Sequence, residues 1–259
     1  MSVDLSRRSL LASAALGAVA SAVVPSLAFA GKDFRIKAVA FDAFPIFDPR
    51  PIFRRCESVF EDHGADLAQA WRNRQFEYQW LRALGGRYAN FWDTTRDALV
   101  FAASSLHIDM TAQQRDLLMS GYLQLRAWPD VKPALQILRS LGLKLAFLSN
   151  ATLGILQSGI ENSDLHGAFD TVISSDQIQS FKPDPRAYQL GAQTLGLRKE
   201  EILFVAFAGW DVAGAKWFGY PTFWNNRQSV VAEQLSATPD ASGATLNELV
   251  NYVRTRLAA

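Results

Sequence analysis

The sequence predicts an α/β protein, with a doubly wound, mainly parallel sheet as its core and a helical domain inserted into it. Two patterns favour this fold. Apolar runs typical of buried strands recur at βα spacing through the second half of the chain, with helical segments between them. By contrast, roughly one hundred residues separate the first such run from the second, far more than a βα connection needs. We expect this interval to form a unit of its own.

The expected strands are short apolar runs, because strands of a parallel sheet are covered on both faces. They are Ile36–Phe41, Leu143–Leu148, Thr171–Ser174, Ile202–Phe207 and Pro221–Trp224. The helices expected around the last four are Pro133–Leu141, Thr152–Glu161, Pro185–Leu195 and Val212–Phe218. Asp184 followed by Pro185 favours the start of a helix, since a capping carboxylate precedes a proline in the first turn.

The long interval after the first strand has no buried-strand run and is expected to form helices. These are Ile52–His63, Leu67–Leu84, Asn90–Leu106 and Ala112–Leu125. We place the core domain in residues 31–50 and 128–259 and a helical cap domain in residues 51–127. A lid over the strand ends would exclude water from the groups beneath it. The aromatic surplus of this interval could equally form the face of a homodimer.

The first thirty residues have the pattern of a twin-arginine (Tat) signal peptide. Arg7 and Arg8 precede an alanine-rich apolar stretch, and Ala28-Phe29-Ala30 offers a signal peptidase site. The alternative is a membrane-anchoring helix, but the stretch is short and weakly hydrophobic for a span of ~20 residues, and Pro25 interrupts it. We expect cleavage after Ala30, export to the periplasm and no stable membrane anchor after cleavage.

Composition argues against several kinds of partner. Without residues 1–30, the 26 basic and 25 acidic residues become 24 of each, so a basic face for nucleic acid is not expected. A single cysteine, Cys56, excludes an intramolecular disulfide. The three histidines, His63, His107 and His166, show no metal-ligand spacing, and we expect no metal and no other cofactor.

Polar residues follow the ends of four core strands. Asp42 follows the first, Ser149-Asn150 the second, Lys182 the third and Trp210-Asp211 the fourth. In a parallel sheet these ends meet at one edge, where ligands of open α/β sheets bind. Taken singly, Ser149-Asn150 and Asp211 could merely cap the helices that follow. Together the five polar side chains predict a catalytic site.

The chain resembles the L-2-haloacid dehalogenases (type II) of the haloacid dehalogenase superfamily. The resemblance runs essentially from Phe34 to the C-terminus, and its motifs keep their order and spacing. They are Phe41-Asp42-Ala43-Phe44, Phe47-Asp48, Ala70 to Gln75, Glu77-Tyr78, Trp80-Leu81-Arg82, Leu148-Ser149-Asn150, Lys182-Pro183-Asp184 with Tyr188, and Ile202 to Val205 with Trp210-Asp211. The resemblance implies a Rossmann-like core with a helical cap, hydrolysis of a carbon–halogen bond, and often a homodimer.

The chemistry of the loop after the first strand favours dehalogenation over the phosphatase activity found in the same superfamily. Phosphate ester hydrolysis needs an acid two residues after the nucleophile, and Mg²⁺ to neutralise the phosphate. The acid position is Phe44 here, and the loop before Asp211 has no further carboxylate for a metal. A halide departs without a proton, and a 2-haloacid is only a monoanion.

The resemblance implies how the substrate is held and attacked. Asp42 would attack C2, displacing the halide with inversion, and water would then hydrolyse the aspartyl ester to release a 2-hydroxy acid. Arg72, from the cap, would receive the departing halide, and Asn150 would donate a hydrogen bond to it. Ser149 would bind the carboxylate of a short 2-haloalkanoic acid.

The remaining matching residues would prepare the nucleophile and shape the pocket. Lys182 would pair with the nucleophilic carboxylate and keep it ionised. Tyr188 would orient that network, and Asp211 would be the base for water. Phe44 and Trp210 would make the pocket walls apolar.

Three positions depart from the family pattern. Pro45 stands where a hydroxyl is expected, and Ala206 and Ala208 replace a serine and an asparagine that orient water. Loss of one preorganised donor can slow a reaction ~100-fold or more. These departures predict slow ester hydrolysis, and they leave open a weakened relative that only binds a small carboxylate or halide. A phosphatase is the third alternative.

Overall fold

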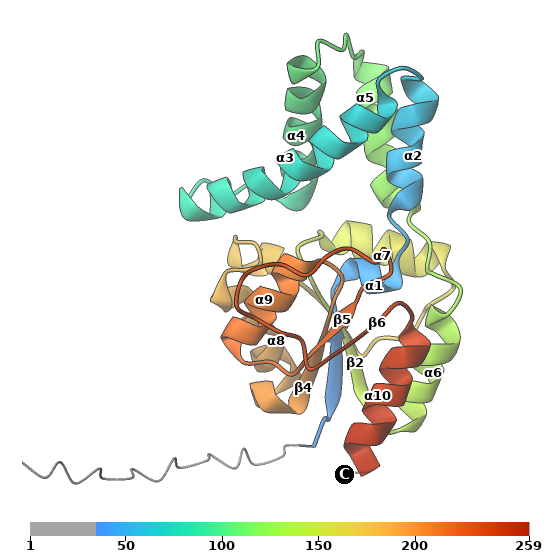
Figure 1. Ribbon diagram of the computed structural model, residues 1–259, viewed down its shortest axis with the longest axis vertical. Coiled ribbons are helices and arrows are strands. Elements are labelled where there is room, and N and C mark those ends of the chain that lie inside the picture. The colour runs from blue at the N-terminus through green and yellow to red at the C-terminus, as the bar shows by residue number, and fades with distance from the viewer. Residues whose placement is uncertain (1–34, 259) are drawn as a thin grey trace, which may run out of the picture. The chain divides into compact units, whose positions relative to one another are not determined.

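The computed structural model describes residues 35–258, so the expected signal peptide of residues 1–30 lies outside the part described. Its sheet has six strands, paired in parallel in the order β3-β2-β1-β4-β5-β6 (Figure 1). The strands are β1 Ala38–Phe41, β2 Lys144–Ser149, β3 Thr171–Ser174, β4 Ile202–Ala206, β5 Thr222–Asn225 and β6 Ala241–Gly243. The predicted α/β fold with a parallel sheet is confirmed. Because the strand order reverses at β1, the ligand-binding edge of the sheet is expected beside the end of this strand.

Helices cover both faces of the sheet, which makes it doubly wound. Successive strand residues point to opposite faces. Val39 and Phe41 belong to one buried apolar cluster, shared with α6 (Val131–Ser140), α7 (Leu153–Asn162) and α10 (Leu246–Ala258). Ala38 and Ala40 belong to the other, shared with α8 (Pro185–Leu195) and α9 (Gly209–Phe218). The apolar runs of the sequence therefore reflect burial on two faces at once.

Four of the helices between β1 and β2 pack against one another beyond the edge at which β1 ends (Figure 1). They are α2 (Arg50–Val59), α3 (Gly64–Leu84), α4 (Phe91–Ser105) and α5 (Ala112–Met119), followed by the 3₁₀ helix η1 (Ser120–Gln124). Trp71 of α3 is fully buried among them, and its indole Nε1 donates to the Thr95 carbonyl of α4 at 2.8 Å. We call these elements the helical insertion.

The two chain segments that join the helical insertion to the core run side by side. Phe47 and Ala127 form an antiparallel bridge, and the Asp48 amide donates to the Arg126 carbonyl at 2.9 Å. The outgoing segment contains the short helix α1 (Ala43–Ile46), whose N-cap is Asp42. The insertion therefore leaves and rejoins the core at one place, next to the end of β1.

The sequence did not predict three elements, namely α1, β6 and α10. β6 is a three-residue edge strand, Ala-Ser-Gly, and has no apolar run by which it could be recognised. The helix expected over Ala112–Leu125 also ends earlier, at Met119, and continues as η1. Two further 3₁₀ helices, η2 (Ser175–Ile178) and η3 (Lys199–Glu201), lie in core loops. Within residues 35–258, no helix is both long enough and apolar enough to cross a membrane.

Candidate active site

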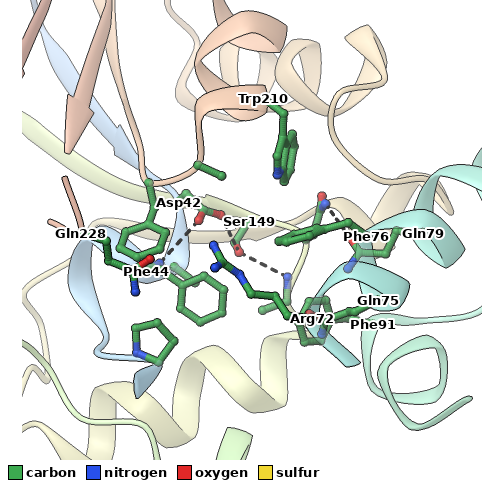
Figure 2. Close-up of a pocket in the computed structure, with 16 residues that line it drawn as sticks. Asp42, Phe44, Arg72, Gln75, Phe76, Gln79, Phe91, Ser149, Trp210 and Gln228 are labelled. Atoms are coloured by element: carbon green, nitrogen blue, oxygen red, sulfur yellow. Dashed lines mark hydrogen bonds between the residues drawn. The ribbon is translucent and has the colours of Figure 1, made fainter. Parts of the chain in front are cut away.

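A pocket lies between the sheet edge and the helical insertion, and Asp42 is one of its walls (Figure 2). Ser149 is the last residue of β2, which pairs in parallel with β1, so its hydroxyl comes beside Asp42. The cavity has a volume of about 40 Å³. Its lining residues are Asp42, Ala43, Phe44, Pro49, Arg72, Gln75, Phe76, Gln79, Phe91, Ser149, Asn150, Ala151, Phe207, Ala208, Trp210 and Gln228.

The two oxygens of the Asp42 carboxylate have different surroundings. Oδ1 accepts from the Lys182 ammonium at 2.9 Å and from the Ser149 hydroxyl at 3.2 Å. Oδ2 accepts only a long hydrogen bond of 3.5 Å from the Phe44 amide, among the contacts of the described chain. One oxygen is therefore fixed by the core, and the other keeps lone pairs free for a ligand in the pocket.

Lys182 lies beneath Asp42, where its side chain is 1 % exposed. Its Nζ also donates to Asp211 Oδ2 at 2.6 Å. Burial lowers the pKa of Lys182, but the charges of Asp211 and Asp42 more than offset this, so its pKa is raised above the ordinary value. The ammonium is thus positively charged at neutral pH and is shared between the two carboxylates.

Asp211 stands in the first turn of α9 and is 1 % exposed. Its Oδ1 accepts from the Tyr188 hydroxyl at 2.7 Å, and its Oδ2 accepts from Lys182. Burial raises the pKa of Asp211 to about 6, although the Lys182 charge opposes the shift. Gly214, one turn later, makes room for the Tyr188 hydroxyl, which a Cβ at that position would strike. Burial and the charge of Asp211 raise the pKa of Tyr188 well above its ordinary value, so the phenol remains a donor.

In this geometry Lys182 lies between Asp42 and Asp211, and Asp211 does not line the pocket. Both of its oxygens are engaged, whereas a general base must reach the proton that it removes, directly or through one water. What the structure supports directly is that Asp211 positions the ammonium of Lys182. The role of Asp211 as the base for water stays a prediction, as does the orienting role of Tyr188.

Arg72 reaches into the pocket from α3, and its side chain extends toward Asp42 (Figure 2). Burial lowers the pKa of Arg72, while its interaction with Tyr122 acts weakly in the opposite direction. Among the residues described, no carboxylate lies within ion-pair distance of its guanidinium, whereas nearby Arg74 pairs with Glu77 at 2.8 Å. A half-buried cation that faces a pocket and has no ion-pair partner is typical of an anion-binding group.

Five aromatic residues contribute to the walls of the pocket. Phe44 meets the ring of Phe207 edge to face at 5.9 Å, and Trp210 meets Phe76 of α3 at 5.4 Å. Because Trp210 belongs to the core and Phe76 to the helical insertion, this contact closes the pocket from both sides. Phe44 and Trp210 both line the pocket, and their contact with a substrate stays a prediction.

Asn150 lies in the pocket wall, but its amide is engaged by protein groups. Its Oδ1 accepts from the Lys182 backbone N–H at 2.8 Å and from the Ser175 hydroxyl at 3.0 Å. Its Nδ2 donates to Gln79 Oε1 at 2.9 Å, with a weaker contact to the Lys182 carbonyl at 3.4 Å. Donation from Asn150 to a halide therefore stays a prediction, since both amide hydrogens have oxygen acceptors in this structure.

A family model described as haloacid dehalogenase-like hydrolase matches residues 26–219. The chain belongs to this family. An (S)-2-haloacid dehalogenase from Pseudomonas sp. (strain YL) is 39% identical to it over 221 residues, which is 85% of this chain and 95% of that protein. Membership of the family confirms the predicted enzyme class, a hydrolase.

Solved structures of haloacid dehalogenases agree with the fold. The L-2-haloacid dehalogenase RSc1362 superposes with a TM-score of 0.83 at 37% identity, covering 85% of this chain and 99% of that one. The L-2-haloacid dehalogenase from Xanthobacter autotrophicus with chloropropionic acid covalently bound gives a TM-score of 0.76 at 33% identity, covering 85% and 98%. The resemblance seen in the motifs is thereby confirmed for the family and the fold.

The positions that depart from the family pattern lie in and around the pocket of this haloacid dehalogenase-like hydrolase. Ala208 lines the pocket as the N-cap of α9 and offers no side-chain donor. Ala206, at the end of β4, and Pro45, in α1, are buried. The places where the family pattern has hydroxyl and amide groups are therefore apolar here, close to the Asp42 carboxylate.

Sequence reasoning missed several pocket residues, above all Gln79. Arg72, Gln75, Phe76 and Gln79 are spaced at three, four and seven residues, so they share one face of α3. That periodicity was available in the sequence once Arg72 had been chosen. No periodic pattern in the sequence indicated Gln228 and Phe207, because both residues lie in loops. Across residues 35–258, no group of three or more His, Cys, Asp and Glu side chains is arranged to hold a metal.

Proposed function

We propose that this protein is an (S)-2-haloacid dehalogenase that converts a short 2-haloalkanoic acid and water into a 2-hydroxy acid, a halide and a proton. One observation supports this most directly. The free Oδ2 of Asp42 belongs to the same small pocket as the unpaired guanidinium of Arg72. A nucleophilic oxygen that shares a pocket with an anion acceptor is what displacement of a halide requires.

In the first step, Oδ2 of Asp42 attacks C2 of the substrate in line with the carbon–halogen bond. The C2–O bond forms as the halide leaves with the bonding electrons, which inverts the configuration at C2. Arg72 receives the halide, and Ser149 binds the substrate carboxylate. The aromatic walls keep water away from the carboxylate, so that its attack is not weakened by hydration.

In the second step, water attacks the carboxyl carbon of the Asp42 ester. Negative charge then develops on Oδ1, the oxygen that already accepts from the Lys182 ammonium at 2.9 Å. Donors aimed at the atom that becomes charged are the most effective form of electrostatic catalysis. Collapse of the tetrahedral intermediate breaks the bond between the ester oxygen and the carboxyl carbon, releases the 2-hydroxy acid and regenerates Asp42. Asp211 acts in this step as the base or by holding Lys182.

The size of the pocket supports a short substrate. A cavity of about 40 Å³ holds roughly three water molecules, given that one needs ~10–15 Å³. Such a space favours the shortest haloacids, and even one of two carbon atoms has five non-hydrogen atoms, so the pocket must widen to admit it. The aromatic contact between Trp210 and Phe76 would limit longer chains on the side of the helical insertion.

Halide release from the two enantiomers of 2-chloropropionate tests the proposed function. We expect chloride and D-lactate from the L-enantiomer and neither product from the D-enantiomer. Mass spectrometry of the protein during turnover should reveal the ester on Asp42. Absence of both the adduct and free chloride with the L-enantiomer would disprove the hydrolase.

A weakened relative that binds a small anion is the second candidate, because Pro45, Ala206 and Ala208 remove donors around the nucleophile. Asp42→Asn separates the two functions. In a dehalogenase this change lowers chloride release by at least ~10⁴-fold, as loss of a nucleophile does in other enzymes. In an anion-binding protein it preserves or improves affinity for propionate, since it removes a negative charge from the pocket.

The helical insertion acts as the cap of this site in our proposal. Cap and core approach each other at Tyr88, whose hydroxyl donates to Asp176 and whose ring lies 5.2 Å from that of Phe181. Removing this contact with Tyr88→Phe should speed the exchange of product and raise the KM. Unchanged values of both would argue against cap movement at this contact.

A homodimer is also proposed, formed through the outer surface of the helical insertion. Leu84 is 88 % exposed and Leu81 is 61 % exposed on α3, and Val100 and Phe101 of α4 are also exposed. Light scattering after gel filtration should give about twice the mass of one chain, and Leu84→Glu should shift it to the monomer. A monomeric parent protein would contradict the dimer.

Export through the Tat pathway is proposed from the sequence, namely from Arg7, Arg8 and the Ala28-Phe29-Ala30 site. In a bacterial host, the full chain should reach the periplasm with residue 31 as its new N-terminus. Replacing both arginines with lysine should retain it in the cytoplasm. Equal distribution of the two forms would refute the assignment.

A further inference from the structure

One buried hydrogen-bond donor of the pocket is unaccounted for in the reaction described above. Nε2 of Gln79 has no partner among the described residues, although the side chain is only 1 % exposed. Gln79 lies two turns after Arg72 on the pocket-facing side of α3 and is itself a lining residue (Figure 2). A buried donor without a partner is costly, and native proteins rarely keep one without a reason.

The orientation of the Gln79 amide follows from its neighbours. The backbone N–H of Lys182 can only donate, so it fixes Oδ1 as the atom of Asn150 that faces it at 2.8 Å. Nδ2 of Asn150 must then face Gln79, where it donates to Oε1 at 2.9 Å. The oxygen of Gln79 is thereby committed, and its NH₂ group is left over.

The same hydrogen bonds leave Asn150 without a free amide hydrogen for a ligand in the pocket. Its Nδ2 hydrogens are directed at Gln79 Oε1 and, more weakly, at the Lys182 carbonyl. Gln79 Oε1 thus accepts a hydrogen bond from Asn150, and Gln79 Nε2 replaces Asn150 Nδ2 as the amide donor without a protein partner among the described residues. Gln75, one turn earlier, differs because its Nε2 donates to the Thr95 hydroxyl at 2.6 Å and to the Tyr122 hydroxyl at 3.1 Å.

The geometry points to Gln79 as the amide donor to the departing halide, in the place expected of Asn150. This inference rests on the proposed function. In an in-line displacement the halide leaves on the side of C2 opposite Asp42, which is the side of the helical insertion. Arg72 and Gln79 both reach the pocket from α3 of that insertion, whereas Ser149, which binds the substrate carboxylate, belongs to the core. The indole Nε1 of Trp210, also buried without a partner in the described chain, adds a third donor on this pocket.

Gln79→Glu tests the inference most sharply, because it keeps the shape and the oxygen that accepts from Asn150 but replaces the NH₂ donor by a second acceptor. The matched control is Gln113→Glu. It places the same charge on the helical insertion, at an exposed position of α5 outside the pocket. Gln79→Met, which adds no charge, is the second variant.

Chloride binding is measured by broadening of the ³⁵Cl NMR line, with bromide as competitor, so that no turnover is needed. We expect Gln79→Glu to weaken chloride and bromide binding about 10- to 100-fold and to slow the first step of the reaction similarly. Gln79→Met should weaken both less, because it frees Nδ2 of Asn150. Gln113→Glu should change halide binding by less than about threefold, and the affinity for propionate should be unchanged in Gln79→Met.

Several results would overturn the inference. Halide binding unchanged in Gln79→Glu, an equal loss in Gln113→Glu, or a loss of propionate affinity in Gln79→Met would each show that Gln79 is not the halide donor. The proposed function is judged separately, by chloride release from L-2-chloropropionate in the parent protein. Chloride release with unaltered halide binding in the Gln79 variants would refute only the role of Gln79.

Discussion

The two sides of the pocket differ in how completely their polar groups are satisfied. On the core side, Asp42, Lys182, Asp211 and Tyr188 form a continuous network with contacts of 2.6 to 2.9 Å. On the side of the helical insertion, Arg72 has no counter-ion and Gln79 has an amide donor without a partner, within the described residues. The Lys182 network is therefore complete without a ligand, whereas Asp42 Oδ2, the Trp210 indole and the donors of the insertion gain partners from one.

This difference teaches how the two parts divide the work. The core holds a charged nucleophile in one geometry, and its buried carboxylates compensate for the lysine charge that they surround. The insertion presents positive and donor groups that gain a partner only when an anion is present. Changes on the core side should thus damage both folding and catalysis, and changes on the insertion side should damage catalysis alone.

Lys182→Met should have the largest effect, because it leaves two carboxylates facing each other without their shared cation. We expect a stability loss of about 3–5 kcal/mol, as for other broken buried ion pairs, and at least a ~10³-fold lower rate. Urea unfolding and chloride release measure the two effects. The control is Lys216→Met, whose pair with Asp240 is 27 % and 37 % exposed and should contribute under ~1 kcal/mol. Similar stability losses in both variants would contradict the distinction.

Arg72→Met should slow the first step by about 10²–10³-fold while leaving the free energy of unfolding unchanged or slightly higher. The guanidinium loses no protein partner, and a half-buried charge is removed. Arg74→Met, which breaks the pair with Glu77, should leave the rate unaltered. A stability loss in Arg72→Met without a rate loss would reverse the roles assigned to the two sides.

The pH dependence should report on Asp211, whose pKa is raised by burial to about 6. Below this pH the carboxyl group takes up a proton and Lys182 loses one acceptor, so the rate should fall about tenfold per pH unit. The folded state holds this proton more tightly than the unfolded state, whose aspartate titrates near 3.8. Protonation of Asp211 between these values therefore favours folding, and activity should be lost without a stability loss from this group.

Single-turnover measurements across the same pH range sharpen the role of Asp211. A decline in formation of the Asp42 ester means that Asp211 acts through Lys182. A decline confined to ester hydrolysis means that Asp211 is the base for water. A rate that stays constant from pH 7 to pH 5 would exclude both roles.

Ala208→Asn should have the smallest effect and the opposite sign, a roughly three- to tenfold faster hydrolysis of the ester. It returns an amide to a position that lines the pocket next to the nucleophile. Ala208→Leu has a similar size without a donor and should not accelerate this step. Equal behaviour of the two variants would mean that water is oriented elsewhere in the pocket.

The fold was largely predictable because burial on two faces imposes long apolar runs. β3 and α8 were predicted with the bounds that the structure has, and the other predicted strands differ at their ends by one or two residues. β6 and α10 lay outside the prediction. β6 is an edge strand of three small residues, and nothing in its composition distinguishes it from a loop.

The members of the site were more predictable than their contacts. The convergence of Asp42, Ser149 and Lys182 follows from the parallel order of the strands that precede them. The engagement of Asn150 does not, because it depends on Gln79, a residue 71 positions away in the chain. Which groups bond to the Asn150 amide is determined only when all of its possible partners are packed around it.

The sequence by itself determined the α/β class, the position of the helical insertion and the carboxylate of Asp42 at the end of the first strand. Each of these depends on local patterns, namely apolar runs, their spacing and the residue that follows a strand. Only the tertiary structure decided that Asp211 supports Lys182 from behind, and that Arg72 and Gln79 keep donors free in the pocket. The physical reason is that donors and acceptors from distant segments compete for the same partners in a buried site. Which hydrogen bonds form depends on how those segments pack together.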